Sequence, residues 1–140
     1  KALCKVKDNY DYVLIDCPPN LGILTINALS ASDEVIVPSK TDYLSYRGIE
    51  MLLNTIEAII EDVNSELSFK GIIATLFNSR SKDDKEILEG MKNEYDVLGV
   101  IKNMVATKNA IYEGKAIIEL DANHDVSKEY MSIVDMILND

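Results

Sequence analysis

The sequence predicts an α/β domain in which helices cover both faces of a parallel sheet. Apolar runs of strand length alternate with longer segments of helical periodicity, which is typical of βαβ units with right-handed crossovers. The first run has four consecutive apolar residues, as expected for a strand buried on both faces. The runs lie at residues 12–15, 33–38, 70–77 and 97–101. No linker or repeat divides residues 1–140, so we expect a single domain.

The first strand is predicted to deliver a carboxylate to its carboxyl end. Asp16 directly follows the run, and Pro18 and Pro19 then end the ladder because proline has no N–H to donate. Ligands of open α/β sheets bind just outside the carboxyl ends of the strands. Two interpretations of Asp16 follow from this position: it caps the next turn, or it holds a metal ion such as Mg²⁺.

The elements around this strand are predicted in order along the chain. Residues 1–9 contain Ala2, Leu3 and Val6 and look like the last turns of an amphipathic helix, so we expect the chain to open inside an element. Residues 22–31 are a short apolar helix, and a polar loop, residues 39–45, follows the second strand. Residues 47–63 are the clearest helix, with an acidic outer face and an apolar inner face of Ile49, Leu52, Leu53, Ile56, Ile59, Ile60 and Val63.

The second half of the chain continues the alternation. Residues 82–95 are a helix with Ile87, Leu88, Met91 and Tyr95 inward. A loop with a short helical turn spans residues 102–114 after the fourth strand. The last helix, residues 126–138, presents an apolar face of Val126, Tyr130, Ile133, Val134 and Ile137.

Composition restricts the classes of partner. No apolar run is long enough to span a membrane, and no secretory signal opens the chain. Cys4 and Cys17 lack metal-ligand spacing and indicate a reduced intracellular protein, while His124 is expected to be a solvated residue without a partner. The formal net charge is −10, so any contact with DNA phosphates requires a local basic patch.

Several motifs together identify a family resemblance. Residues 10–22 read YDYVLIDCPPNLG and are followed by LTINAL at residues 24–29. With residues 33–38, 42–43, 48, 52–56 and 78–80, and more weakly 114–115, they resemble the ParA/Soj family of partition ATPases, a branch of the MinD-like, deviant Walker A group of P-loop proteins. The resemblance covers nearly the whole chain. It implies a P-loop NTPase or Rossmann-like fold that is incomplete at the N-terminus, because no Gly-rich phosphate-binding loop is present.

The resemblance implies roles for the residues after the first strand. Asp16 corresponds to the Walker B aspartate, a catalytic residue that supports Mg²⁺ beside the β- and γ-phosphates. Pro18, Pro19 and Asn20 correspond to the switch segment that senses the γ-phosphate. Asp42 with Tyr43 matches an acidic–aromatic pair near the nucleotide and the dimer face, although Asp42 also fits a solvated carboxylate at a helix start.

Cofactor-binding residues are also expected after the third and fourth strands. Asn78 and Arg80 match an Asn-Ser-Arg motif whose Asn contacts adenine in related ATPases, although Asn is also common in turns. Lys102 and Asn103 follow the fourth strand, where relatives usually have Pro-Arg-Asn. The usual arginines are absent, and this departure makes nonspecific DNA binding doubtful and favours a surface role for Lys102, Lys108 and Lys115.

The predicted function is that of the C-terminal part of a ParA/Soj-like ATPase that segregates chromosome or plasmid DNA. The resemblance implies an ATP-dependent homodimer, a ParB/Spo0J-like DNA-binding partner, and a cytoplasmic protein that associates with the nucleoid when ATP is bound. ATP and Mg²⁺ both require the phosphate-binding loop, so we expect this chain alone neither to bind ATP tightly nor to hydrolyse it.

Two other classes of protein fit parts of this sequence pattern. A phospho-acceptor receiver domain has a similar order of Asp, Thr and Lys, echoed by Asp16, Thr75 and Lys102, but it needs two further acids on its first strand. A non-catalytic adaptor of the same fold remains the other alternative, since the usual arginines are missing.

Overall fold

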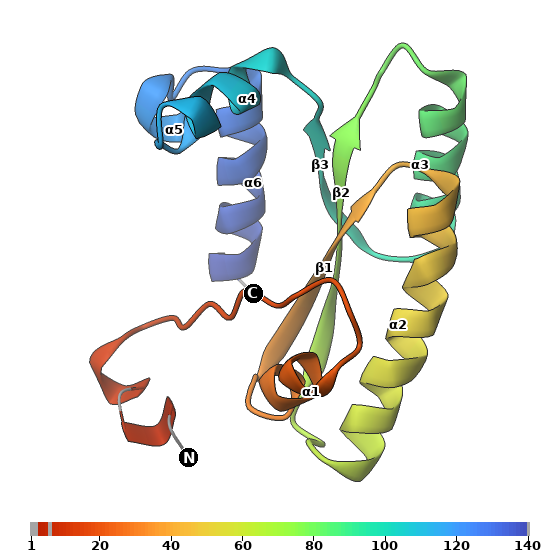
Figure 1. Ribbon diagram of the computed structural model, residues 1–140, viewed down its shortest axis with the longest axis vertical. Helices are drawn as coiled ribbons and strands as arrows, with labels where there is room; N and C mark the ends of the chain where they lie inside the picture. Colours follow the sequence, from red (N-terminus) through yellow and green to blue (C-terminus); the bar gives the residue numbers. More distant parts are fainter. Residues whose placement is uncertain (1–2, 6, 140) are drawn as a thin grey trace. The chain divides into compact units, whose positions relative to one another are not determined.

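The computed structural model describes residues 3–5 and 7–139 (Figure 1). The described chain divides into two compact units. The first unit holds the residues up to 35 together with residues 51–69, and the second holds residues 36–50 together with the residues from 70 onward.

Helices and strands alternate along most of the chain, as the sequence predicts. Two short 3-10 turns come first, at Leu3–Lys5 and Lys7–Asn9. The strands are β1 (Glu34–Lys40), β2 (Ser68–Phe77) and β3 (Val97–Lys102). The helices are α1 (Ile23–Leu29), α2 (Tyr43–Asp62), α3 (Lys82–Glu94), α4 (Val105–Tyr112), α5 (Ile117–Leu120) and α6 (Asp125–Asn139).

The three strands form one sheet in the order β1-β2-β3. β2 and β3 are parallel, with Ile72 opposite Val97 and Phe77 opposite Lys102. Along β2, the register shifts between Ala74 and Phe77, and within this stretch Leu76 has a φ of 55°. A branched side chain rarely adopts such a left-handed conformation, so β2 carries a strained bulge just before its carboxyl end.

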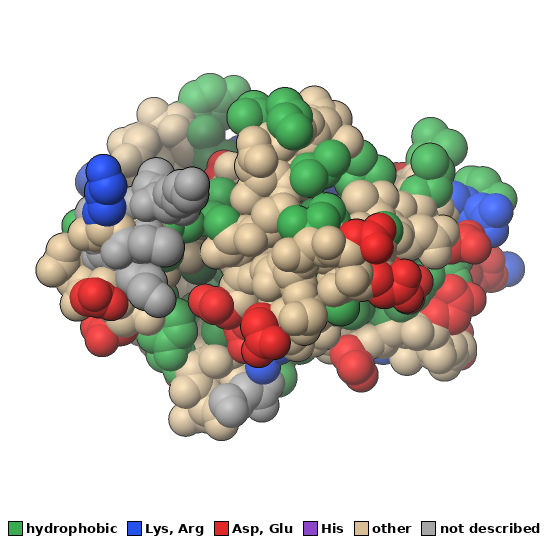
Figure 2. Space-filling model, turned by 90° about the horizontal axis from the view of Figure 1, so that it is seen from below, with side chains coloured by type: hydrophobic (Ala, Val, Ile, Leu, Met, Phe, Trp, Pro, Cys, Tyr) green, Lys and Arg blue, Asp and Glu red, His purple; other side chains and the backbone are tan. Residues whose placement is uncertain are grey.

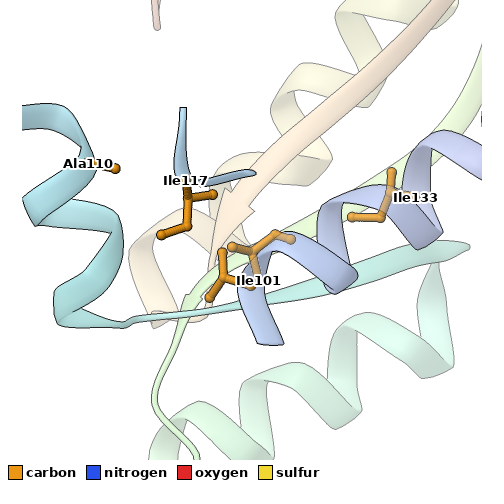
Figure 3. Packing of buried hydrophobic residues seen from close by; sticks show 5 residues of the cluster. Ile101, Ala110, Ile117 and Ile133 are labelled. Atoms are coloured by element: carbon orange, nitrogen blue, oxygen red, sulfur yellow. The ribbon is translucent and has the colours of Figure 1, made fainter. Parts of the chain in front are cut away.

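β3 and α6 share a hydrophobic core in the second unit. Val126 and Ile133 of α6 are buried with Ile101 of β3, Ala110 of α4 and Ile117 of α5 (Figure 3). In Figure 1, α6 and α3 lie on opposite sides of the β2–β3 pair. The predicted fold class, a parallel sheet with helices on both faces, is therefore confirmed.

The inner faces of the two long central helices agree with the predicted periodicity. Ile49, Ile56 and Ile59 of α2 are buried, and so are Leu88 and Met91 of α3. The predicted acidic outer face of α2 is exposed, with Glu50, Asn54, Glu57, Glu61 and Asp62 all open to solvent.

The prediction of a buried strand at residues 12–15 is wrong for this structure. These residues form no regular element, and the side chain of Leu14 is 96% exposed. A strand exists only where a neighbouring strand completes its hydrogen bonds, and none of β1, β2 or β3 pairs with this segment in the described structure. Asp16 therefore does not stand at the tip of a strand here.

Predictions at the chain ends also need correction. The N-terminal residues form 3-10 turns rather than the end of an α-helix, and the predicted Ala2 and Val6 lie outside the described residues. On α6, Tyr130 and Val134 are 43% and 40% exposed, because the buried face runs through Val126, Ile133 and Ile137 instead.

Three local details also differ from the predictions. The loop expected at residues 39–45 is short, because β1 extends to Lys40 and α2 begins at Tyr43. Val63 follows the last residue of α2 and is exposed rather than inward. The side chain of His124 has a partner, since its Nδ1 accepts a hydrogen bond from the N–H of Val126 in the first turn of α6.

Among the described residues, no helix has the length and apolar content needed to cross a membrane.

Candidate functional site

A small pocket lies at the carboxyl ends of β2 and β3, within the second unit. Its volume is about 260 Å³. Parallel neighbouring strands bring their carboxyl ends to the same edge of a sheet, so the residues that follow β2 and β3 meet there. The lining consists of Phe77, Asn78, Ser79, Arg80, Lys102, Asn103 and Met104. The structure thus brings together four residues that the sequence analysis assigned to a cofactor, namely Asn78, Arg80, Lys102 and Asn103.

Asn78 begins a tight turn that leads from β2 into α3. Its Oδ1 accepts a hydrogen bond from the N–H of Arg80 at 3.1 Å, and its carbonyl accepts one from the N–H of Ser81 at 3.0 Å. This arrangement is an Asx-turn. The two acceptor oxygens of Asn78 therefore form the turn, as the turn-forming interpretation expects. The Nδ2 donor has no hydrogen bond within the described part of the chain and remains available to a ligand.

Asp84 supports this turn, and the sequence analysis did not single it out. Its Oδ2 accepts hydrogen bonds from the Thr41 hydroxyl at 2.7 Å and from the Asn78 N–H at 3.0 Å. Hydrogen bonds from Ser81 and Thr41 hold the pKa of Asp84 below its ordinary value by stabilising the carboxylate. The spacing Ser81-x-x-Asp84 at the start of a helix is a capping-box signal that points to Asp84.

Glu129 likewise accepts a backbone hydrogen bond at the end of β3. Its Oε1 lies 2.9 Å from the Lys102 Nζ, and its Oε2 accepts a hydrogen bond from the Lys102 N–H at 3.1 Å. The hydrogen bond and the charge of Glu129 raise the pKa of Lys102. The predicted cofactor ligand Lys102 is therefore held by an acid of α6. Arg80 carries no ion pair within the described residues and is the more available cation beside the pocket.

Asp42 lies in the same unit but does not line the pocket. Its Oδ1 accepts a hydrogen bond from the Ser45 N–H at 2.8 Å, and its Oδ2 accepts one from the Ser45 hydroxyl at 3.1 Å. Asp42 thus caps α2, as the helix-start interpretation expects. Its role toward a nucleotide remains a prediction, and the adjacent Tyr43 is 65% exposed.

Asp16 and the predicted switch residues belong to the first unit. The carboxylate of Asp16 is exposed. Two hydrogen bonds stabilise the turn that follows Asp16. The Thr25 hydroxyl donates to the Asn20 carbonyl at 2.7 Å, and the Asn20 N–H donates to the Pro18 carbonyl at 2.8 Å. Pro19 is exposed within this turn.

A metal ion at Asp16 would need ligands in addition to this carboxylate. No group of three or more His, Cys, Asp or Glu side chains that could hold an ion occurs among the described residues. Mg²⁺ at nucleotide sites is commonly bound by one or two carboxylates together with phosphates and waters. A single exposed carboxylate fits an ion that arrives with a phosphate group.

A parallel α/β sheet with a polar pocket at its carboxyl edge is the arrangement of open α/β folds that bind ligands at that edge, and solved structures of P-loop NTPase-like proteins superimpose on this chain. An McdA variant in complex with ATP, from Cyanothece, superimposes with a TM-score of 0.85 at 20% identity, over 96% of this chain and 54% of that one. Cobyrinic acid a,c-diamide synthase from Mycobacterium smegmatis, with a bound ATP analogue and magnesium, matches with a TM-score of 0.63 at 37% identity, over 71% of this chain and 39% of that one.

Sequence comparison identifies the family within this fold. A family profile described as an AAA domain matches residues 1–69. The sporulation initiation inhibitor protein Soj of Bacillus subtilis is 36% identical over 136 residues, which are 95% of this chain and 54% of Soj. The chain belongs to the ParA/Soj-type family of partition ATPases, and it spans about half the length of the Soj protein that it matches.

Proposed function

We propose that this chain is the C-terminal part of a ParA-like ATPase domain and that it supplies the base-binding pocket of the nucleotide site. The observation that supports this is the meeting of Asn78, Arg80 and Asn103 around one pocket at the carboxyl edge of the sheet. This is the edge at which open α/β sheets bind their ligands. The polar residues come from two strands that are adjacent in the sheet.

The pocket suits the base of a nucleotide better than a whole nucleotide. Its volume of about 260 Å³ is below the roughly 300–1,000 Å³ of pockets that enclose drug-sized ligands. Phe77 and Met104 supply apolar surface for the faces of a ring, and the free Nδ2 of Asn78 supplies a donor to its edge. Glu129 pairs with Lys102, so among the described residues the unpaired cation at the pocket is Arg80, at its rim.

The phosphates and Mg²⁺ would be held elsewhere in the whole protein. ATP and Mg²⁺ need a phosphate-binding loop, and no such Gly-rich sequence occurs in these 140 residues. Asp16 would support the Mg²⁺, and Pro18, Pro19 and Asn20 would form the adjoining switch. Residues 12–15 would then become a strand once a neighbouring strand of the whole protein pairs with them.

Membership of the family supports a proposal for the cellular role. The protein would be a cytoplasmic ATPase that dimerises with ATP, associates with the nucleoid, and is released when a ParB-like partner stimulates hydrolysis, so that chromosome or plasmid DNA is segregated. Figure 2 shows carboxylate side chains spread over much of the visible face and few basic ones. With a net charge of −10, these residues favour contact with DNA through a partner or through another part of the protein.

The test is ATP hydrolysis by the full-length protein, measured with and without DNA and the ParB-like partner. Replacing Asp16 with Ala should abolish turnover, and Asn78→Ala should raise the KM for ATP. Asp11→Ala, which removes an exposed carboxylate from the same segment, is the matched control and should leave both unchanged. A full-length protein that dimerises without hydrolysing ATP would instead be a non-catalytic adaptor.

A further inference from the structure

Asp84 lies where three elements of the second unit meet. It belongs to the first turn of α3, and its N–H donates to the hydroxyl of the helix cap Ser81 at 3.1 Å. The same residue reaches out of the helix with Oδ2, which accepts from Thr41 just after β1 and from Asn78 just after β2. One carboxylate oxygen therefore joins the carboxyl ends of two strands.

The bond to Asn78 matters because the strand itself does not hold that residue. β2 ends at Phe77, whose carbonyl accepts from the Asn103 N–H at 3.0 Å, and the strained bulge at Leu76 lies immediately before it. The first backbone donor beyond the strand, the Asn78 N–H, is directed to Asp84 instead of to β3. The direction in which Asn78 leaves the sheet is thus set by Asp84.

The Thr41 end of this arrangement is rigid. Thr41 is 4% exposed, and its N–H donates to the Thr75 carbonyl at 3.3 Å. The Thr75 hydroxyl donates back to the Ser39 carbonyl at 3.2 Å. A hydroxyl fixed in this way holds the Asp84 carboxylate in one place, and a hydrogen bond to a charged group is stronger than one between neutral groups.

We propose that Asp84 is a positioning residue for base recognition, acting through Asn78. It holds the Asn78 backbone, and therefore the carboxamide that lines the pocket, in the position from which Nδ2 can donate to N1 of adenine, an atom that in guanine carries a hydrogen and cannot accept. This inference rests on the proposed function, in which the pocket binds the base. A misplacement of about 1 Å is enough to weaken such a contact strongly.

The experiment compares the affinities of the full-length protein for ATP and for GTP. Asp84→Asn keeps the size of the side chain but weakens both accepted hydrogen bonds, and we expect the preference for ATP over GTP to fall roughly ten-fold. Asp83→Asn removes a neighbouring exposed carboxylate that has no hydrogen bond within the described residues, and the preference should not change. Thr41→Val should reduce the preference in the same direction as Asp84→Asn, while Thr41→Ser, which keeps the hydroxyl, should retain it.

A purely structural role predicts a different pattern. In that case Asp84→Asn would lower the melting temperature and would weaken both nucleotides by the same factor or by none, and the inference would be overturned. Hydrogen exchange of the Asn78 N–H should quicken in Asp84→Asn but not in Asp83→Asn, and unchanged exchange would also overturn it. If the unmodified protein showed no preference that depends on Asn78, the proposed function itself would fail.

Discussion

Glu129 of α6 holds Lys102, the last residue of β3, by its ammonium group at 2.9 Å and by its backbone N–H at 3.1 Å. Asp84 of α3 likewise accepts the N–H of Asn78, the first residue after β2. At both strands a carboxylate from a later helix takes the backbone donor that the sheet leaves at its edge. These two acids therefore shape the pocket without lining it.

Because Glu129 contacts both the side chain and the backbone of Lys102, Glu129→Ala and Lys102→Ala should lower the stability of the protein by different amounts. Glu129→Ala leaves the Lys102 N–H without its acceptor, whereas Lys102→Ala keeps the backbone hydrogen bond to Glu129 and loses only the ion pair. We expect Glu129→Ala to lower the free energy of unfolding by about 1 kcal/mol for that hydrogen bond, and Lys102→Ala to lower it by less. Urea unfolding of the two variants checks this, and equal losses would contradict it.

The hydrogen bonds of Asp84 predict a specific dependence of stability on acid. Because the folded protein lowers the pKa of Asp84 below its ordinary value of 3.8, the carboxylate contributes stability above that pH. This contribution is lost as the pH falls through the lower pKa of the folded state. Urea unfolding between neutral pH and pH 2 should therefore show a smaller acid-induced loss of stability in Asp84→Asn than in the unmodified protein. Parallel curves for the unmodified protein and Asp84→Asn would refute the assignment.

Substitution by alanine at two glycines should change the stability of the protein in opposite directions. A Cβ at Gly99 of β3 would lie 2.5 Å from Cγ1 and 2.6 Å from Cδ1 of the buried Ile133, so Gly99→Ala should destabilise the protein by about 1–3 kcal/mol. A Cβ at Gly48 of α2 would meet nothing within 4 Å, so Gly48→Ala should stabilise the helix by about 0.5–1 kcal/mol. Thermal unfolding measures both, and a stable Gly99→Ala variant would argue against the contact between β3 and α6.

The exposed segment at residues 12–15 predicts an effect that depends on the length of the protein. Leu14 is 96% exposed, so Leu14→Asn should change the stability of this 140-residue chain by less than about 0.5 kcal/mol. In the full-length protein, where we propose that the segment is a buried strand, the same change should cost at least about 2 kcal/mol. Leu44→Asn, at a site that is 82% exposed, is the control for a surface leucine. A small effect of Leu14→Asn in both proteins would contradict the proposed strand.

Periodicity predicted those elements that find their partners within this chain. Of the predicted inward residues, Ile49, Ile56 and Ile59 of α2 and Leu88 and Met91 of α3 are buried, because an amphipathic helix and a sheet can cover each other's apolar surfaces. Residues 12–15 have an equally clear strand pattern but lack a paired neighbour. A strand pattern in the sequence does not include the neighbour that must supply its hydrogen bonds.

In the candidate site, too, some residues could be predicted from the sequence and others could not. Asn78, Arg80, Lys102 and Asn103 could be proposed from the sequence, since all four lie within three residues of the end of a predicted strand, at positions where the family has motifs. Their supporting acids could not, because Asp84 reaches Thr41 across 43 residues and Glu129 reaches Lys102 across 27. The capping-box spacing indicates Asp84 as a helix-start residue but does not indicate its contacts with two strand ends.

The sequence by itself determined the family, the alternation of helices and strands from α1 to β3, and the residues that follow β2 and β3, because these depend on local pattern. It did not determine whether residues 12–15 form a strand. Only the tertiary structure decided which of the residues after β2 and β3 remain available to a ligand. It tied Lys102 to Glu129 and the Asn78 backbone to Asp84, and it left the Asn78 Nδ2 and the Arg80 guanidinium without protein partners among the described residues. The reason is physical: the charge and freedom of a polar group are set by what folding places within hydrogen-bonding distance of it.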